Sequence, residues 1–137
     1  MSAAVNTGTT TATVGRLAEQ AAEAVRTLNH LTRPGVGALA EPAEVCELVA
    51  ALACTTGRLP QLLGQLSGWL VSQQRAGRLR VDTWSPQPNP AAAVAAAAGC
   101  LTQAAHSTQR AGHALDAAHQ HLAHLATTGN DEQEDRS

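Results

Sequence analysis

Three long stretches of the chain repeat apolar residues in alternating steps of three and four, a pattern that constrains the fold more than any other feature. In an α-helix such a repeat gathers the apolar side chains into one stripe that packs against other helices. The first stripe consists of Val14, Leu17, Ala21, Ala24, Leu28 and Leu31. Pro34 and Gly35 follow it, and proline disfavours helical geometry in the residue before it. We therefore predict a helix over residues 11–32, preceded by a flexible segment, residues 1–10.

The second stripe is longer and contains two residues that disfavour helices. Its members are Val45, Leu48, Leu52, Thr55, Leu59, Leu62, Leu66 and Trp69. Pro42 suits the first turn of a helix, so this helix is expected to begin there. Gly57 and Pro60 interrupt the pattern, but its phase continues past them, which predicts one long helix that is kinked here and ends near Arg78. The alternative is two helices separated at Gly57, which would make a four-helix bundle.

The third stripe follows a proline-rich connector, residues 81–90. It consists of Val94, Ala97, Leu101, Ala104, Thr108, Ala111, Leu115, Ala118, Leu122 and Leu125. Asn89 followed by Pro90 is a start signal, because an Asn side chain caps the first turn and proline fits the first helical position. Gly129 suits the position just beyond the end. The pattern predicts a helix of about 37 residues.

These three patterns predict an all-α fold, an elongated antiparallel three-helix bundle. A chain of 137 residues has the usual size of one domain, which we place at residues 11–128. Residues 129–137 are polar and acidic and are expected to form a disordered tail. Lys, Ile, Phe and Tyr are absent and Ala occupies 29 positions, so the core must be built from Leu, Val and Ala.

Charge and hydropathy suggest a soluble cytoplasmic protein without a membrane partner. The formal net charge is -2, so no strong overall field attracts the chain to nucleic acid or to a membrane. The N-terminus has no secretory signal pattern, and the longest apolar run, residues 91–101, is about half the length that a membrane span needs. Cys46, Cys54 and Cys100 match no disulfide or zinc spacing and are expected to be buried thiols.

Four of the six histidines lie within residues 112–125. A metal site on a helix needs ligands three or four residues apart on one face, and within this segment only His121 and His124 meet that spacing. In heptad terms, none of these histidines falls on the core side of the third helix. We therefore expect a solvated polar face and no metal, with His121 and His124 as weak candidates.

No catalytic motif occurs in the chain, which predicts neither an enzyme nor a cofactor. Arg75, Arg78 and Arg80 form a small basic cluster at the end of the second predicted helix. Arginines at this end also complement the helix dipole, so the cluster needs no ligand to explain it. A nucleic-acid-associated accessory protein of a mobile element, binding through these arginines, is the alternative function.

The lengths of the helices predict an uncovered tip. The first helix, with about 22 residues, would cover the hairpin of the other two only to roughly Leu63. The tip would then present Leu62, Leu66, Trp69, Leu70, Val94 and Leu101. Exposed apolar surface often marks an interface, and Trp is enriched among binding anchors. We predict a non-catalytic protein that self-associates or binds a partner helix at this tip; the alternative is that Trp84 and the connector cover it.

Three segments give the chain a resemblance to small helical proteins of actinobacteria, some of them encoded on plasmids or integrative elements. The segments read LNHLTRPG at residues 28–35, RLPQLLGQL at 58–66 and AAHQHLAHLA at 117–126. The resemblance covers most of residues 14–126 and implies a cytoplasmic accessory role. It assigns a function to no individual residue.

Overall fold

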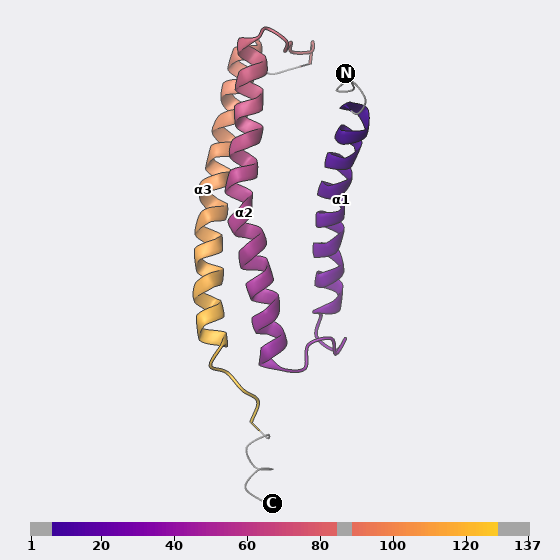
Figure 1. Ribbon diagram of the computed structural model, residues 1–137, viewed down its shortest axis with the longest axis vertical. Coiled ribbons are helices and arrows are strands. Elements are labelled where there is room, and N and C mark those ends of the chain that lie inside the picture. The colour runs from indigo at the N-terminus through magenta and orange to yellow at the C-terminus, as the bar shows by residue number, and fades with distance from the viewer. Residues whose placement is uncertain (1–6, 85–88, 129–137) are drawn as a thin grey trace, which may run out of the picture. The chain divides into compact units, whose positions relative to one another are not determined.

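The computed structural model describes the backbone of residues 7–84 and 89–128 and the side chains of residues 13–84 and 89–128. In these ranges the chain forms three α-helices and no strand: α1 (Thr7–Leu31), α2 (Pro42–Arg75) and α3 (Pro90–Leu122) (Figure 1). The prediction of an all-α protein is therefore confirmed. The chain divides into two compact units, Met1–Ala40 with α1 and Glu41–Ser137 with α2 and α3. The prediction of a single domain over residues 11–128 stays a prediction.

In the first unit, α1 begins four residues before the predicted position and ends at Leu31. The chain then turns, with Arg33 N–H donating to the His30 carbonyl and Val36 N–H to the Arg33 carbonyl. Gly35 and Gly37 have φ values of 87° and 80°, a left-handed conformation that glycine adopts without a steric penalty. The predicted stop after α1 is thus confirmed.

In the second unit, α2 is continuous through Gly57 and Pro60, so the alternative of two separate helices is wrong. At its start Pro42 occupies the first turn, and Glu41 N–H donates to the Glu44 carboxylate at 3.3 Å. The helix ends at Arg75, three residues before the predicted position.

Gly77 explains why α2 ends there. Its φ of 67° reverses the chain, Gly77 N–H donates to the Gln74 carbonyl, and Arg78 N–H donates to the Gln73 carbonyl. This pair of hydrogen bonds satisfies carbonyl groups that the end of a helix otherwise leaves without donors.

The start of α3 is the predicted one, because the Asn89 side chain accepts a hydrogen bond of 2.7 Å from Ala92 N–H. Its predicted end near Gly129 is wrong, since α3 ends at Leu122. Beyond it, Leu125 N–H donates to the Leu122 carbonyl in a turn, and the Leu125 side chain is exposed. The predicted last turn therefore buries little apolar surface that could stabilise it.

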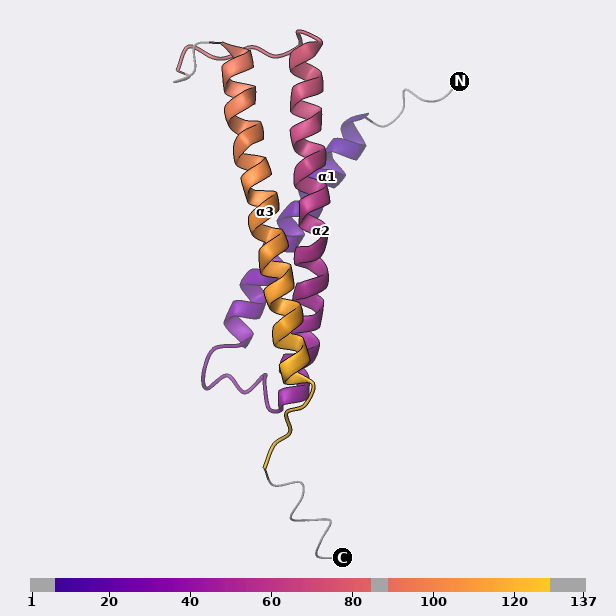
Figure 2. The same cartoon turned by 90° about the vertical axis from the view of Figure 1, so that its left-hand side faces the viewer.

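The helices α2 and α3 lie side by side and antiparallel, as both views show (Figures 1 and 2). Their backbones come close at Gly112 of α3, where an added Cβ would lie 3.7 Å from the Gly57 nitrogen and 4.0 Å from Thr56 Cγ2. Val94, with 8% of its surface exposed, is the one buried apolar side chain in the described part of the chain. Two helices alone therefore enclose a thin core.

From Val94 onward, the buried and half-buried residues of α3 recur in steps of three and four. They are Val94, Ala98, Leu101, Ala105, Thr108, Gly112, Leu115, His119 and Leu122, joined by Ala104 and Ala118 at the margin. The predicted column of Val94, Leu101 and every seventh residue onward is thus confirmed up to Leu122. The second predicted column is wrong in part, because Ala97 and Ala111 are exposed. Columns of alanine residues border the column of Val94 and the leucines on both sides. The column that contains Gly112 is the one where the backbones of α3 and α2 come close.

On α2, the side that faces α3 is shifted by one residue from the predicted stripe in the second half of the helix. Thr56, Leu63 and Leu70 are half-buried, whereas their predicted neighbours Thr55, Leu62 and Trp69 are exposed. One residue corresponds to about 100° around a helix. In this half of the helix the exposed members of the predicted stripe therefore lie beside the α2–α3 interface.

Candidate interaction surface

The most prominent surface feature is the apolar side of α2 that α3 leaves open. We call it the α2 stripe and define it as Leu48, Leu52, Thr55, Leu59, Leu62, Leu66 and Trp69. Three consecutive members have much of their surface exposed: Leu62 by 48%, Leu66 by 46% and Trp69 by 58%. Leu48, Leu52 and Leu59 are half-buried. Clustered apolar side chains of this kind on a helix are typical of a surface that packs against another helix.

The second helix of the hairpin extends this surface with small residues. Ala97, Ala104, Ala111 and Ala118 form a column on α3, which we call the alanine column; Ala97 and Ala111 are exposed and the other two are half-buried. When two helices pack antiparallel, the residues that stand one position before the interface residues of each helix lie on the same side of the pair. On α3, the alanine column stands one position before Ala98 and every seventh residue after it. On α2, Leu52, Leu59 and Leu66 stand one position before Ala53, Pro60 and Ser67, so the two columns lie on the same side. We call the two columns together the open face.

The six residues predicted to form a bare tip do not share one exposed surface. Leu62, Leu66 and Trp69 belong to the open face, but Val94 is buried and Leu70 and Leu101 are half-buried. These last three lie on the sides of α2 and α3 that face each other. The open face extends further along α2 than the predicted tip, back to Leu48.

The connector after α2 covers part of the tip, although not as predicted. Leu79 and Val81 are half-buried and, with Leu70 and Val94, help to line a small apolar pocket of about 240 Å³. Trp84 is 90% exposed, so it does not cover the tip. The sequence signal that could have identified the covering residues is the alternation of Leu79 and Val81 with arginine and aspartate.

In the other unit, α1 carries an apolar stripe of its own. Val14 and Leu17 are 62% and 59% exposed, and Leu31 is also exposed. The opposite side is polar and includes an exposed ion pair between Arg26 and Glu23, with 3.4 Å between Nη1 and Oε1. The helix is therefore amphipathic.

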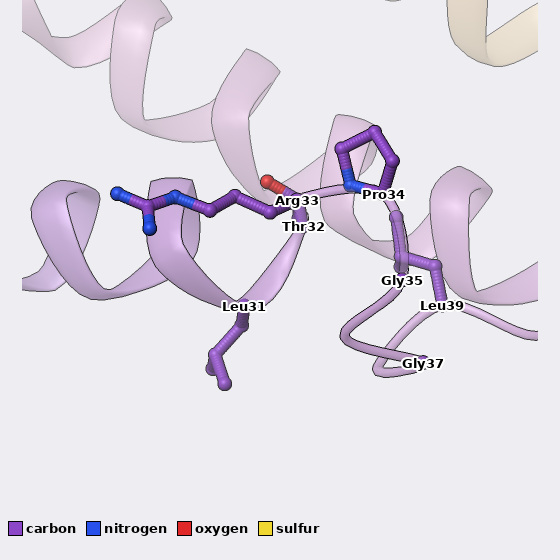
Figure 3. Close-up of a pocket in the computed structure, with 7 residues that line it drawn as sticks. All are labelled: Leu31, Thr32, Arg33, Pro34, Gly35, Gly37 and Leu39. Atoms are coloured by element: carbon purple, nitrogen blue, oxygen red, sulfur yellow. The ribbon is translucent and has the colours of Figure 1, made fainter.

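The turn after α1 encloses a hollow of about 330 Å³, lined in part by Leu31, Arg33, Pro34 and Leu39 (Figure 3). Arg33 extends back along the last turn of the helix, and Leu31 and Pro34 point to different sides. Polar groups do not converge on this hollow as they would in a catalytic site.

The predicted arginine cluster is exposed, with Arg75 in the last turn of α2 and Arg78 and Arg80 after Gly77. None of the three pairs with an acidic side chain in the described ranges. Exposed arginines of this kind can bind phosphate, and nucleic-acid binding stays a prediction.

The histidines are exposed except for His119, which is half-buried on the side of α3 that faces α2. The prediction that none lies on the core side is therefore wrong for His119. His121 and His124 are both exposed, and no group of three or more potential ligands that could hold a metal ion occurs among the residues described. The cysteines are free; Cys46 is half-buried, and Cys54 and Cys100 are exposed, which corrects their prediction as buried thiols.

Over residues 7–84 and 89–128, none of the helices combines the length and the apolar character that crossing a membrane requires. No protein-family model matches the chain, and neither a curated protein nor a solved structure matches it.

Proposed function

We propose that this protein is a non-catalytic interaction protein and that it binds an amphipathic α-helix on the open face. The observation that carries the proposal is the exposure of Leu62, Leu66 and Trp69 on the side of α2 that α3 does not cover. Exposed apolar residues cluster at interfaces, and Trp is frequent among the residues that dominate binding energy. A cytoplasmic setting, as the composition predicts, belongs to the same proposal.

The chemistry of the open face defines the kind of helix that fits it. Between Leu48 and Trp69 the stripe contains only Leu, Thr and Trp, and the alanine column adds no polar group. A matching helix has apolar residues in steps of three and four and no charge on that side, because burying an unpaired charge is unfavourable. The alanines lower the steric barrier to close approach by its backbone.

A third helix on this face would complete the elongated antiparallel three-helix bundle that the sequence predicts. It would also remedy the thin core of the hairpin, in which Val94 is the one buried apolar side chain of the described residues. A second copy of the chain offers amphipathic helices of the required kind, so self-association through the same face is part of the proposal.

The proposal is tested by the binding of a helical probe to the full-length chain. The probe is a fluorescent peptide with the sequence of residues 7–31, which carries an apolar stripe, and the readout is fluorescence anisotropy. The receptor is the full-length chain. We expect saturable binding that Leu62→Glu abolishes.

Gln61→Glu is the matched control, because it adds the same charge to the exposed position next to Leu62 and outside the stripe. It should bind the peptide as the parent receptor does, and circular dichroism should give equal helix content for all variants. Equal binding by the Leu62→Glu and Gln61→Glu receptors, or no binding by the parent receptor, would contradict the proposal.

A further inference from the structure

We infer that the helix bound on the α2 stripe is α2 of a second copy of this chain, antiparallel, with Thr55 of each copy opposite Leu66 of the other. Two hairpins then pack open face to open face as a four-helix bundle. The inference rests on the proposed function, because both need the open face to bind a helix. It goes further because it names the partner, the helix that lies on the stripe and the register.

The first support is the angle between the two apolar sides of each hairpin helix. On α2, the exposed Leu62 and Trp69 stand one position before the half-buried Leu63 and Leu70, which face α3. On α3, the alanine column likewise stands one position before residues that face α2. One residue corresponds to about 100° around a helix. The two neighbours of a helix lie about 90° apart around it in a four-helix bundle and about 60° apart in a three-helix bundle, so this offset favours four helices.

The second support is that the α2 stripe matches itself when its direction is reversed. A two-fold interface uses the same surface on both copies, so that surface must be self-complementary. From Leu52 to Trp69 the steps between stripe members are three, four, three, four and three, which is the same order in both directions. In the inferred register each layer therefore contains one member from each copy: Leu52 with Trp69, Thr55 with Leu66, and Leu59 with Leu62.

The third support is the charge at the edge of the stripe. Arg58 is exposed and borders the stripe on the side away from α3, and Gln65 occupies the same edge one heptad later. In the inferred register, Arg58 of each copy lies beside the neutral Gln65 of the other. A shift by one heptad toward the start of α2 would bring the two Arg58 residues together, and like charges at an interface are unfavourable. A shift toward the end of α2 would leave Leu52 and Thr55 without stripe partners.

The same arginine disfavours the other two-fold arrangement of two hairpins. In that arrangement the two-fold axis runs along the helices, so α2 lies on α3 of the other copy at the same height as on its own α3. Gly57 and Gly112 approach each other in the hairpin, which puts Arg58 and Arg110 at the same height. Both arginines are exposed and would lie side by side at each edge of the interface.

The fourth support is the area that the two faces can bury. In the inferred register the two α2 helices overlap over residues 46–75, a length of about 45 Å. Two packed helices are together about 20 Å across. The open face of each hairpin thus covers about 900 Å², and stable complexes bury about 800 Å² per partner.

Disulfide formation between two single-cysteine variants tests the partner, the direction and the register together. The background is the full chain with Cys46→Ser, Cys54→Ser and Cys100→Ser. Thr55→Cys and Leu66→Cys are made in separate chains, mixed under reducing conditions so that copies exchange, and then oxidised. We expect a covalent heterodimer, identified by mass spectrometry and non-reducing gels. Each variant alone should stay reduced, because its two cysteines would lie about 16 Å apart along the helices.

Three other results would overturn the inference. Faster oxidation of either variant alone than of the mixture would assign a register that is shifted by one heptad. A covalent heterodimer of Leu66→Cys with Ala104→Cys, in place of the expected one, would place α2 on α3 of the other copy. No cross-link in any mixture would remove the second copy from the open face.

A substitution at the edge tests the register without changing the stripe. Gln65→Glu places a carboxylate beside Arg58 of the other copy at two symmetric positions, so it should lower the dissociation constant of the dimer about two- to tenfold. Gln61→Glu is the matched control, because it adds the same charge at an exposed position outside the stripe. Light scattering over a dilution series measures both constants. Equal dissociation constants for the two variants would contradict the inferred register.

The inference and the proposed function fail in different ways. If the peptide of residues 7–31 binds the receptor and no mixture forms a cross-link, the open face binds helices but not those of a second copy. If neither the peptide nor a second copy is found at the face, both are wrong. If the expected heterodimer forms and the peptide does not bind, the second copy occupies the face permanently, and the binding of other helices is wrong.

Discussion

The backbones of α2 and α3 come close at one residue, Gly112. Because an added Cβ there would lie 3.7 Å from the Gly57 nitrogen, alanine fits in ordinary contact but a larger side chain does not. We expect Gly112→Leu to lower the free energy of unfolding by about 1–3 kcal/mol, since the helices must separate to admit it. Urea denaturation followed by circular dichroism measures the change.

Gly99 provides the control at the same scale, because it lies in the same helix and a Cβ there would meet no atom within 4 Å. Gly99→Leu should raise stability by about 0.5–1 kcal/mol through the better helix propensity of leucine. If Gly112→Leu and Gly99→Leu changed the free energy of unfolding equally, the proximity of Gly112 to Gly57 would have no energetic role. The sequence signal for Gly112 was the seven-residue spacing of Ala98, Ala105 and Gly112, which places small residues in one column.

At the scale of elements, the start of each hairpin helix was predictable because capping uses residues that are neighbours in sequence. Asn89 accepts a hydrogen bond from Ala92 N–H, as the Asn-Pro pair indicated. We expect Asn89→Ala to lower the free energy of unfolding by about 1 kcal/mol and Asn89→Ser to retain most of it. Thermal unfolding of both variants checks this, and an equal loss in the two would mean that the side-chain oxygen does not act as a cap.

The ends of the helices were harder to predict than their starts. Gly77 stops α2 with a local pair of hydrogen bonds, and a glycine shortly before the predicted end was the available signal. The end of α3 at Leu122 has no such residue. It depends on how much apolar surface the last turn can bury, which is a property of the packed hairpin and not of the segment.

For the whole molecule, self-association through the open face predicts that two copies associate as the protein concentration rises. Light scattering after size exclusion, over a hundredfold range of concentration, should show dimers at the upper end of that range. Adding salt should change the association little, because the stripe carries no charge.

Two tryptophan substitutions locate the surface responsible. Trp69→Glu should give a monomer at every concentration, because it places a charge on the open face. Trp84→Glu, at a residue that is 90% exposed and outside that face, should leave the dimer intact. Dimers that persist with Trp69→Glu would mean that another surface holds the copies together.

The sequence by itself determined three amphipathic helices, their approximate bounds and the residues that start them. These features depend on contacts within one helical turn and on a period that any helix imposes. Only the tertiary structure decided which side of α2 faces α3 and which side of α3 faces α2. Thr55 and Thr56 illustrate this, because the stripe pattern selected Thr55, whereas Thr56 is the residue at the interface. A helix with adjacent apolar columns can present either one, and the choice depends on the residues of another helix, far away in sequence, that must fit against it.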